Sequence, residues 1–366
     1  MTNTEWFASR KWGIFTHCFH FGNDNFIKSR GGPIPSYNDF IENFDVEKFA
    51  KSLSETNCGY LMFTMGQGQK YWCAPNENFN RITGYKTGEA CSRRDLIEDL
   101  LNALEKYDIP LFLYFTGDGP YADVQAGKAM GFCPDGTIEG RQYITEKFIK
   151  NWGSVLREYS LRYGDRVKGW WVDGCYDFIG YTDEFLNELK KCARAGNPDA
   201  LCAFNNGTEN KNYNNPRFSH LVDSNDHSIT KMEKIEQAFI DGIIDDSGYM
   251  NRDIETQWRE ADDFTAGERT EFSQLPESDN PKRLWHILSF LGQLQSQNSP
   301  RPKYLPNGSG WSACGSRYSG DYMRDYVNAV NAKNGIVTID IAIFDDATFD
   351  LGQIEVLKKL KDIRNK

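Results

Sequence analysis

Short hydrophobic runs alternate with amphipathic segments along most of the chain. Runs rich in β-branched and aromatic residues predict strands at 12–17, 59–64, 109–115, 167–172, 200–204 and 335–342. Hydrophobic residues at three-and-four spacing predict helices at 44–57, 94–107, 144–163, 185–195, 282–294, 321–333 and 352–363. Strands that alternate with helices in this way are typical of repeated βα units, and therefore of a parallel sheet.

The number of these units favours a closed barrel over an open sheet. About eight βα units in 366 residues predict an α/β fold, a (β/α)8 TIM-type barrel with long βα loops. No repeat or linker divides the chain, so we expect a single domain over residues 1–366 and no separate C-terminal domain. The polar stretch at 208–278 has no readable pattern. An open dinucleotide-binding sheet fits less well, because the glycines at 66 and 68 lack the third glycine of a phosphate-binding turn.

Composition and charge narrow the classes of partner. Hydrophobic residues make up 39% of the chain and the net charge is −10, which predicts a globular protein that does not attract nucleic acid or anionic membranes. No run approaches the roughly 20 apolar residues of a membrane span, and the N-terminus lacks the pattern of a signal peptide. Nine cysteines without a C-x-x-C pair indicate reduced thiols. We therefore expect a cytoplasmic protein, or a secreted or periplasmic one if a signal segment precedes this sequence.

Polar residues directly after the predicted strands are the candidates for chemistry. In a closed barrel, the C-terminal ends of the strands build the site. Asp173 ends the strand at 167–172 and precedes Gly174, so its carboxylate is expected to project into the barrel mouth. Position alone leaves a second interpretation open, in which Asp173 caps the following turn.

Several segments, in order and spacing, resemble the α-L-fucosidase family, glycoside hydrolase family 29. They are 6–17 (WFASRKWGIFTH), 44–50 (FDVEKFA), 59–64 (GYLMFT), 94–97 (RDLI), 113–116 (LYFT), 169–174 (GWWVDG), 203–206 (AFNN) and 334–340 (NGIVTID). The resemblance implies a retaining, exo-acting glycoside hydrolase that needs no cofactor and acts on an oligosaccharide or glycoside. The β-sandwich that usually follows the barrel in this family has no counterpart here.

The resemblance also implies which residues act. A retaining mechanism needs two carboxylates, and Asp173 matches the family's nucleophile. The segment DFTAGE at 263–268 is similar to the one that carries the acid/base, which indicates Glu268. Three other glutamates compete for that role: Glu255, Glu260 and Glu271. His17 matches a histidine that binds sugar hydroxyls.

One departure from the family bears on specificity. Where the family carries paired histidines that bind fucose, this chain reads TMGQGQKYW at 64–72. Hydrogen-bonding and aromatic residues there and at other strand ends are therefore our predicted substrate-binding set: Gln67, Gln69, Tyr71, Trp72, Trp171 and Asn205. Three substrate hypotheses stay open, namely an α-L-fucoside, another L-deoxy sugar or α-galactoside-like residue, and a non-catalytic carbohydrate-binding barrel. A second departure, His286 within Trp285-His286, is interpreted as structural.

Metal and thiol chemistry are weaker alternatives. His17, Cys18 and His20 form a dense cluster, but neighbouring strand residues point to opposite faces, so we expect no metal site. A nucleophile at Cys175 would need an activating histidine that the sequence does not supply. The sequence leaves open whether the protein forms a homo-oligomer.

Overall fold

A curled parallel sheet forms the centre of the molecule. The computed structural model describes residues 2–18, 36–68, 70–132, 144–176, 179–207, 259–269, 272–273, 275–276, 284–292, 310–344 and 346–365. The strands of the sheet are β1 (Trp12–Thr16), β2 (Leu61–Thr64), β3 (Leu111–Thr116), β4 (Val167–Asp173), β5 (Leu201–Phe204), β6 (His286–Phe290) and β7 (Ile336–Asp340). Their order is β5-β4-β3-β2-β1-β7-β6, and every neighbouring pair is parallel.

The segment at 263–269 lies between the two edge strands of this sheet. Its backbone bonds to β6 through Arg269 N–H to Leu288 O (2.7 Å), and to the residues just before β6 through Thr265 N–H to Leu284 O (3.0 Å). On its other side, Asp263 N–H donates to Cys202 O of β5 (2.8 Å). The segment therefore takes the place of an eighth strand, and the predicted (β/α)8-like barrel is confirmed.

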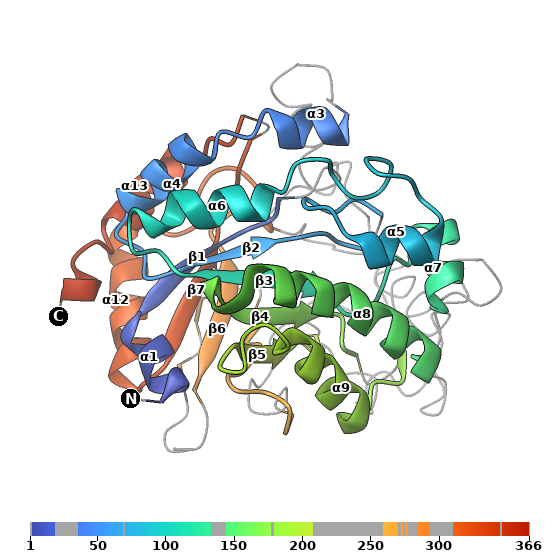
Figure 1. Ribbon diagram of the computed structural model, residues 1–366. Helices are drawn as coiled ribbons and strands as arrows, with labels where there is room; N and C mark the ends of the chain where they lie inside the picture. The colour runs from blue at the N-terminus through green and yellow to red at the C-terminus, as the bar shows by residue number, and fades with distance from the viewer. Residues whose placement is uncertain are drawn as a thin grey trace, which may run out of the picture.

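Helices surround the strands on the outside (Figure 1). They are α1 (Asn3–Ser9), α3 (Tyr37–Glu42), α4 (Val46–Ser54), α5 (Glu77–Thr83), α6 (Leu96–Glu105), α7 (Val124–Met130), α8 (Glu146–Tyr163), α9 (Asp183–Ala193), α12 (Gly320–Ala332) and α13 (Leu351–Lys358), with 3-10 turns at Gly164–Arg166 and Ile363–Asn365. Each of these α-helices begins after a Ser, Thr, Asp or Asn whose side chain accepts a first-turn N–H. No described helix is long and apolar enough to cross a bilayer.

Alternate strand residues fill the barrel interior, as the period of two requires. The buried interior cluster takes residues from every strand and from the segment at 263–269, and it includes Phe15, Met62, Phe112, Trp171, Ala203, Ala266, Leu288 and Ile336. Helix α1 covers the N-terminal end, where the ring of Phe7 stacks on Phe112 with centroids 4.6 Å apart. Of the tryptophan pair in β4, Trp170 faces the outer helices and Trp171 faces the interior.

The helix predicted at 282–294 is wrong, because the chain forms strand β6 there. A strand buried on both faces carries hydrophobic residues on both, so its alternation is hidden and the run matches a helical pattern equally well. The other predicted strands and helices are confirmed, with shifts of a few residues at their ends.

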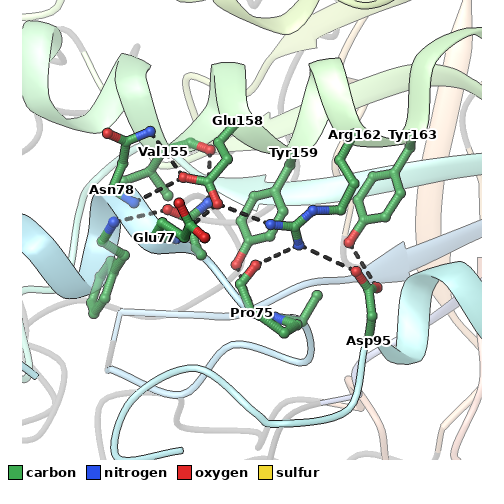
Figure 2. A network of polar contacts seen from close by, with 12 residues as sticks. Pro75, Glu77, Asn78, Asp95, Val155, Glu158, Tyr159, Arg162 and Tyr163 are labelled. Carbon is green, nitrogen blue, oxygen red and sulfur yellow. Dashed lines mark hydrogen bonds and ion pairs between the residues drawn. The ribbon is translucent and has the colours of Figure 1, made fainter. Parts of the chain in front are cut away.

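Helix α8 holds the start of α5 against the barrel through a partly exposed polar network (Figure 2). The carboxylate of Glu158 accepts the backbone N–H groups of Glu77 (2.7 Å) and Asn78 (2.8 Å) at the first turn of α5. It also accepts from Arg162 (2.9 Å), which reaches the carbonyl oxygen of Pro75 and the carboxylate of Asp95, the N-cap of α6. Side chains of α8 therefore cap the first turn of α5 and hold the residue that caps α6.

We expect Glu158→Ala to lower the free energy of unfolding by about 2 kcal/mol, because two first-turn amides and a guanidinium lose their acceptor in a half-buried place. Glu188→Ala on α9 is the matched control. That side chain is 55% exposed and pairs only with Lys191 among the ion pairs recorded for it, so its loss should cost less than about 0.5 kcal/mol. Urea unfolding of both variants measures the difference, and equal losses would contradict the capping role of Glu158.

Candidate active site

Polar side chains form the layer directly above the apolar barrel interior. Each lies two residues after an interior position of its own strand, so the period of two turns it inward. The layer contains His17, Tyr114, Asp173, Asn205, Glu268 and Asp340. It lies at the C-terminal ends of the strands, which is where barrels of this type build their sites.

Asp173 is fixed by three hydrogen bonds at the end of β4. Its Oδ2 accepts from the hydroxyl of Tyr114 (2.6 Å), and its Oδ1 accepts from Asn205 Nδ2 (2.7 Å) and from Gly174 N–H (2.8 Å). Burial, together with the charge of Asp173, holds the pKa of the Tyr114 phenol well above its usual range, so Tyr114 stays a donor. The Asp173 carboxylate is half-buried and its geometry is set before any ligand arrives.

Glu268 meets Asp173 across one amide group. Asn205 Nδ2 lies 2.7 Å from Glu268 Oε2 and 2.7 Å from Asp173 Oδ1. The two carboxylate oxygens can therefore be no farther apart than twice that distance. Like Asp173, Glu268 is partly exposed, whereas the amide between them is fully buried. The structure thus brings together the two predicted carboxylates.

A glycine with positive φ adjoins each carboxylate. Gly174, directly after Asp173, has φ +71°, and a Cβ there would collide with the side chain of Asp118. Gly267, directly before Glu268, has φ +65°, and a Cβ there would collide with the carbonyl oxygen of His286. Only glycine adopts this conformation without strain, so both turns that orient the carboxylates depend on it.

His17 is held by a second acid at the mouth. Its Nδ1 lies 2.8 Å from Oδ1 of Asp340, whose other oxygen accepts the backbone N–H of Ser312 (2.7 Å). The imidazole packs edge-on against the Trp311 ring at 5.6 Å and lies 6.4 Å from the Tyr114 ring. His17 therefore faces the same polar layer as Asp173, while the neighbouring Cys18 is buried toward the outer helices.

Of the substrate-binding residues predicted in the loop after β2, one borders the carboxylates. Gln67 is half-exposed and hydrogen-bonds the Tyr114 hydroxyl, so it borders the carboxylate site. Tyr71 is half-buried and its ring packs against Tyr37 at 4.9 Å. Gln69 lies outside the described residues.

The tryptophans Trp72 and Trp171 correct the prediction. Trp72 has no exposed surface and packs between Phe115 and Trp152, so no ring face is available to a sugar. The reason is a backbone bridge to Gly66, which folds the loop back onto the core. Trp171 is 2% exposed, and its N–H donates to Ala266 O (2.9 Å), so it supports the site from below.

The structure gives less support to another glutamate as acid/base, to a cysteine nucleophile or to a metal site. Glu260 is exposed to solvent, and Glu255 and Glu271 lie outside the described residues. Burial raises the pKa of the Cys175 thiol well above its ordinary value, which disfavours a thiolate nucleophile. No group of three or more His, Cys, Asp or Glu that could hold a metal occurs among the residues that the structure describes, and His20 is not one of them.

His286 has the structural role that the sequence indicated. It is fully buried in β6, where Nε2 contacts Thr338 Oγ1 (2.6 Å) and Nδ1 contacts the carbonyl oxygens of Thr265 and Ala266 (3.0 Å each). Burial lowers the pKa of His286 to about 4, so the ring is neutral and links β6 to the segment that carries Glu268.

A groove of about 590 Å³ lies at the opposite, N-terminal end of the barrel. Its lining includes Trp6, Arg10, Asp108 and Asp199. Arg10 and Asp108 already pair with each other (2.8 Å), and the carboxylate pair lies at the other end of the strands. The groove is therefore separate from the candidate active site.

Two residues of the polar layer were missed in the sequence: Tyr114 and Asp340. Both lie at an interior position of a predicted strand, two residues after Phe112 and Thr338 respectively. Extending the period of two to the end of every predicted strand would have identified them.

Three solved structures share this fold. An α-L-fucosidase isoenzyme 1 from Paenibacillus thiaminolyticus matches with a TM-score of 0.60 and 15% identity, over 99% of this chain and 75% of its own. A GH29 α-L-fucosidase from Bacteroides thetaiotaomicron, described as a trapped covalent intermediate with 2-fluoro-fucosyl fluoride, matches with 0.55 and 13%, over 98% and 73%. An endo-fucoidan hydrolase of glycoside hydrolase family 107 matches with 0.63 and 12%, over 99% and 53%.

Sequence comparisons add nothing to this. No protein-family model matches the chain, and no curated protein matches it in sequence. The likeness to fucosidases is therefore one of fold, and it extends over nearly the whole chain.

Proposed function

We propose that this protein is a retaining glycoside hydrolase that removes an α-L-fucosyl or closely related residue from the end of a glycoside. One observation carries the proposal: a single amide donates to both Asp173 and Glu268 at the mouth of the barrel. Retaining glycosidases hold their two carboxyl groups about 5 to 5.5 Å apart, whereas inverting enzymes need about 6.5 to 9.5 Å. A gap spanned by one nitrogen at 2.7 Å from each side matches the shorter spacing.

The mechanism follows from this spacing. A carboxylate oxygen of Asp173 attacks the anomeric carbon while Glu268 transfers its proton to the departing oxygen, which breaks the glycosidic bond and leaves a glycosyl ester on Asp173. Glu268, now ionised, takes a proton from water, and the resulting attack on the anomeric carbon releases the sugar and restores Asp173. Two inversions leave the anomeric configuration unchanged.

The substrate class rests on the neighbours and on the resemblance of the strand ends. The neighbours are named as two α-L-fucosidases, one of them in complex with 2-fluoro-fucosyl fluoride, and an endo-fucoidan hydrolase. His17 matches the position that contacts sugar hydroxyls in the fucosidase family, and Gln67 lies where that family carries its paired-histidine motif. We therefore propose that the site takes an L-fucose-like sugar with an altered set of hydroxyl contacts.

The test is a panel of aryl α- and β-glycosides that includes fucoside, galactoside, rhamnoside and arabinoside. We expect turnover of the α-L-fucoside or a sugar that shares its ring stereochemistry, with the free sugar released first as the α anomer. Proton NMR during the first minutes of the reaction distinguishes the anomers before mutarotation. Release of the β anomer from an α-glycoside would contradict a retaining mechanism.

The panel also addresses the binding-only alternative. A carbohydrate-binding barrel would give no turnover of any member, yet would bind the free sugar or an oligosaccharide in isothermal titration calorimetry. Binding without turnover would show that the protein binds carbohydrate and does not hydrolyse it. Turnover of any member of the panel would exclude the binding-only alternative.

A further inference from the structure

Asn205 has every polar group engaged at the centre of the site. It follows β5 directly, and its side chain is fully buried. Its backbone N–H donates to Val172 O (2.7 Å), and its carbonyl oxygen accepts from Cys175 N–H (2.8 Å), so the residue is attached to the end of β4 on both sides of Asp173. The side-chain oxygen accepts from Gly207 N–H (3.1 Å).

These contacts assign the orientation of the amide. Because a backbone N–H can only donate, the group that faces Gly207 must be the oxygen Oδ1. The nitrogen Nδ2 therefore faces the carboxylates, and its two hydrogens serve one carboxylate each. No hydrogen remains on this amide for a sugar hydroxyl, which argues against the substrate-binding role predicted for Asn205.

We infer that Asn205 is a positioning residue that sets the spacing of the Asp173 and Glu268 carboxylates; the inference rests on the proposed function. Two carboxylates this close repel each other, and a shared donor offsets that repulsion. Asn205 donates to Glu268 Oε2, which favours Oε1 as the oxygen that carries the proton for the leaving group.

The variant Asn205→Ala tests this with a readout that a merely structural residue would not move. Ionised Asp173 and ionised Glu268 each lose a donor, so protonation becomes easier and both limbs of the pH profile of kcat/KM should move to higher pH by about half to one unit. We expect kcat to fall about 10- to 100-fold with KM changed less than about threefold, because positioning and not sugar binding is lost.

Asn197→Ala is a matched control at the other end of β5. Asn197 is also a buried asparagine whose oxygen accepts the N–H two residues ahead, that of Asp199 (3.0 Å), but its nitrogen donates to the carbonyl oxygen of Val167 (3.0 Å) instead of carboxylates. The Asn197→Ala variant should be less stable than the wild type, but its pH profile of kcat/KM should not shift. A rise in KM for Asn205→Ala with unmoved limbs would show that Asn205 binds the sugar and would overturn the inference.

Two further measurements keep the inference testable. Asn205→Leu keeps nearly the same shape and removes both donors without adding a titrating group, so it should shift the limbs at least as far as Asn205→Ala. NMR titration of the Asp and Glu carboxyl carbons reports the same shift without any turnover. A wild type that hydrolyses no glycoside, with titrations that move in the variant, would refute the function alone; active wild type with unmoved titrations would refute the inference alone.

Discussion

In the Asp173→Asn variant, kcat/KM for the best glycoside substrate is expected to fall by about 10⁴-fold or more, because an amide cannot form the glycosyl ester. The site should otherwise stay intact. The new amide oxygen can accept from Asn205 and Gly174 in place of Oδ1, and the new amide nitrogen can donate to the Tyr114 oxygen, whose own proton then turns to Gln67. The melting temperature should be equal or higher, since one of two neighbouring charges is removed.

Two comparisons make this result specific. Asp199→Asn is the same chemical change on an exposed residue in the groove at the far end of the barrel, and it should leave kcat/KM unchanged. Asp173→Gly creates room for azide, which should restore turnover and yield the glycosyl azide of inverted configuration. Full activity in Asp173→Asn, with its folded state verified by circular dichroism, would show that another group forms the intermediate.

Most of the barrel could be predicted because it depends on short-range periodicity. Strands β1 to β5 appear as hydrophobic runs bounded by turns, and the N-cap Asp45 stands between Phe44 and an amphipathic stretch. The prediction of a helix in place of strand β6 has a different cause. Both faces of β6 are buried, and its two polar residues, His286 and Ser289, fall one on each face, so the sequence shows no alternation of polar and apolar residues.

The sequence predicts where the site lies in the barrel, but not which of its side chains are hydrogen-bonded to one another. The rule that parallel strands end at one face of the barrel predicts that Asp173 and Asn205 converge. Glu268, 63 residues after Asn205, was indicated only by the resemblance of its segment, because no strand was predicted there. The rule does not predict that one amide joins the two carboxylates, because that depends on the rotamers of three side chains. Long-range hydrogen bonds leave no periodic trace in a sequence.

Loop residues were harder still. Trp72 was predicted as a sugar platform because it follows a strand by several residues, in a segment whose path the sequence does not fix. A bridge between Gly66 and Trp72 turns that segment back, and the ring fills the space between β3 and α8. The period of two applies only while the chain stays in the strand, so its predictive value ends within about two residues of the strand end.

Loss of the second carboxylate should have an effect that depends on the leaving group. Glu268→Ala is expected to slow hydrolysis of glycosides with poor, alkoxide-like leaving groups by about 10²- to 10⁴-fold, because these need a proton as the bond breaks. Aryl glycosides with acidic phenols need no proton, so their first step should change little. With them the glycosyl ester on Asp173 accumulates, and a burst of phenol should precede a slow steady state.

Azide separates Glu268 from its neighbours as the acid/base. Azide needs no deprotonation, so it should attack the accumulated ester, speed the second step and give the glycosyl azide of retained configuration, opposite to that from Asp173→Gly. Glu260→Ala is the matched control, since Glu260 is exposed and lies eight residues earlier in the same described segment. If Glu268→Ala left hydrolysis unchanged while Glu260→Ala showed the burst and the rescue, the proton would come from Glu260. The opposite pair of results is expected because Glu268 alone of the two shares a hydrogen-bond donor with Asp173 among the contacts described for them.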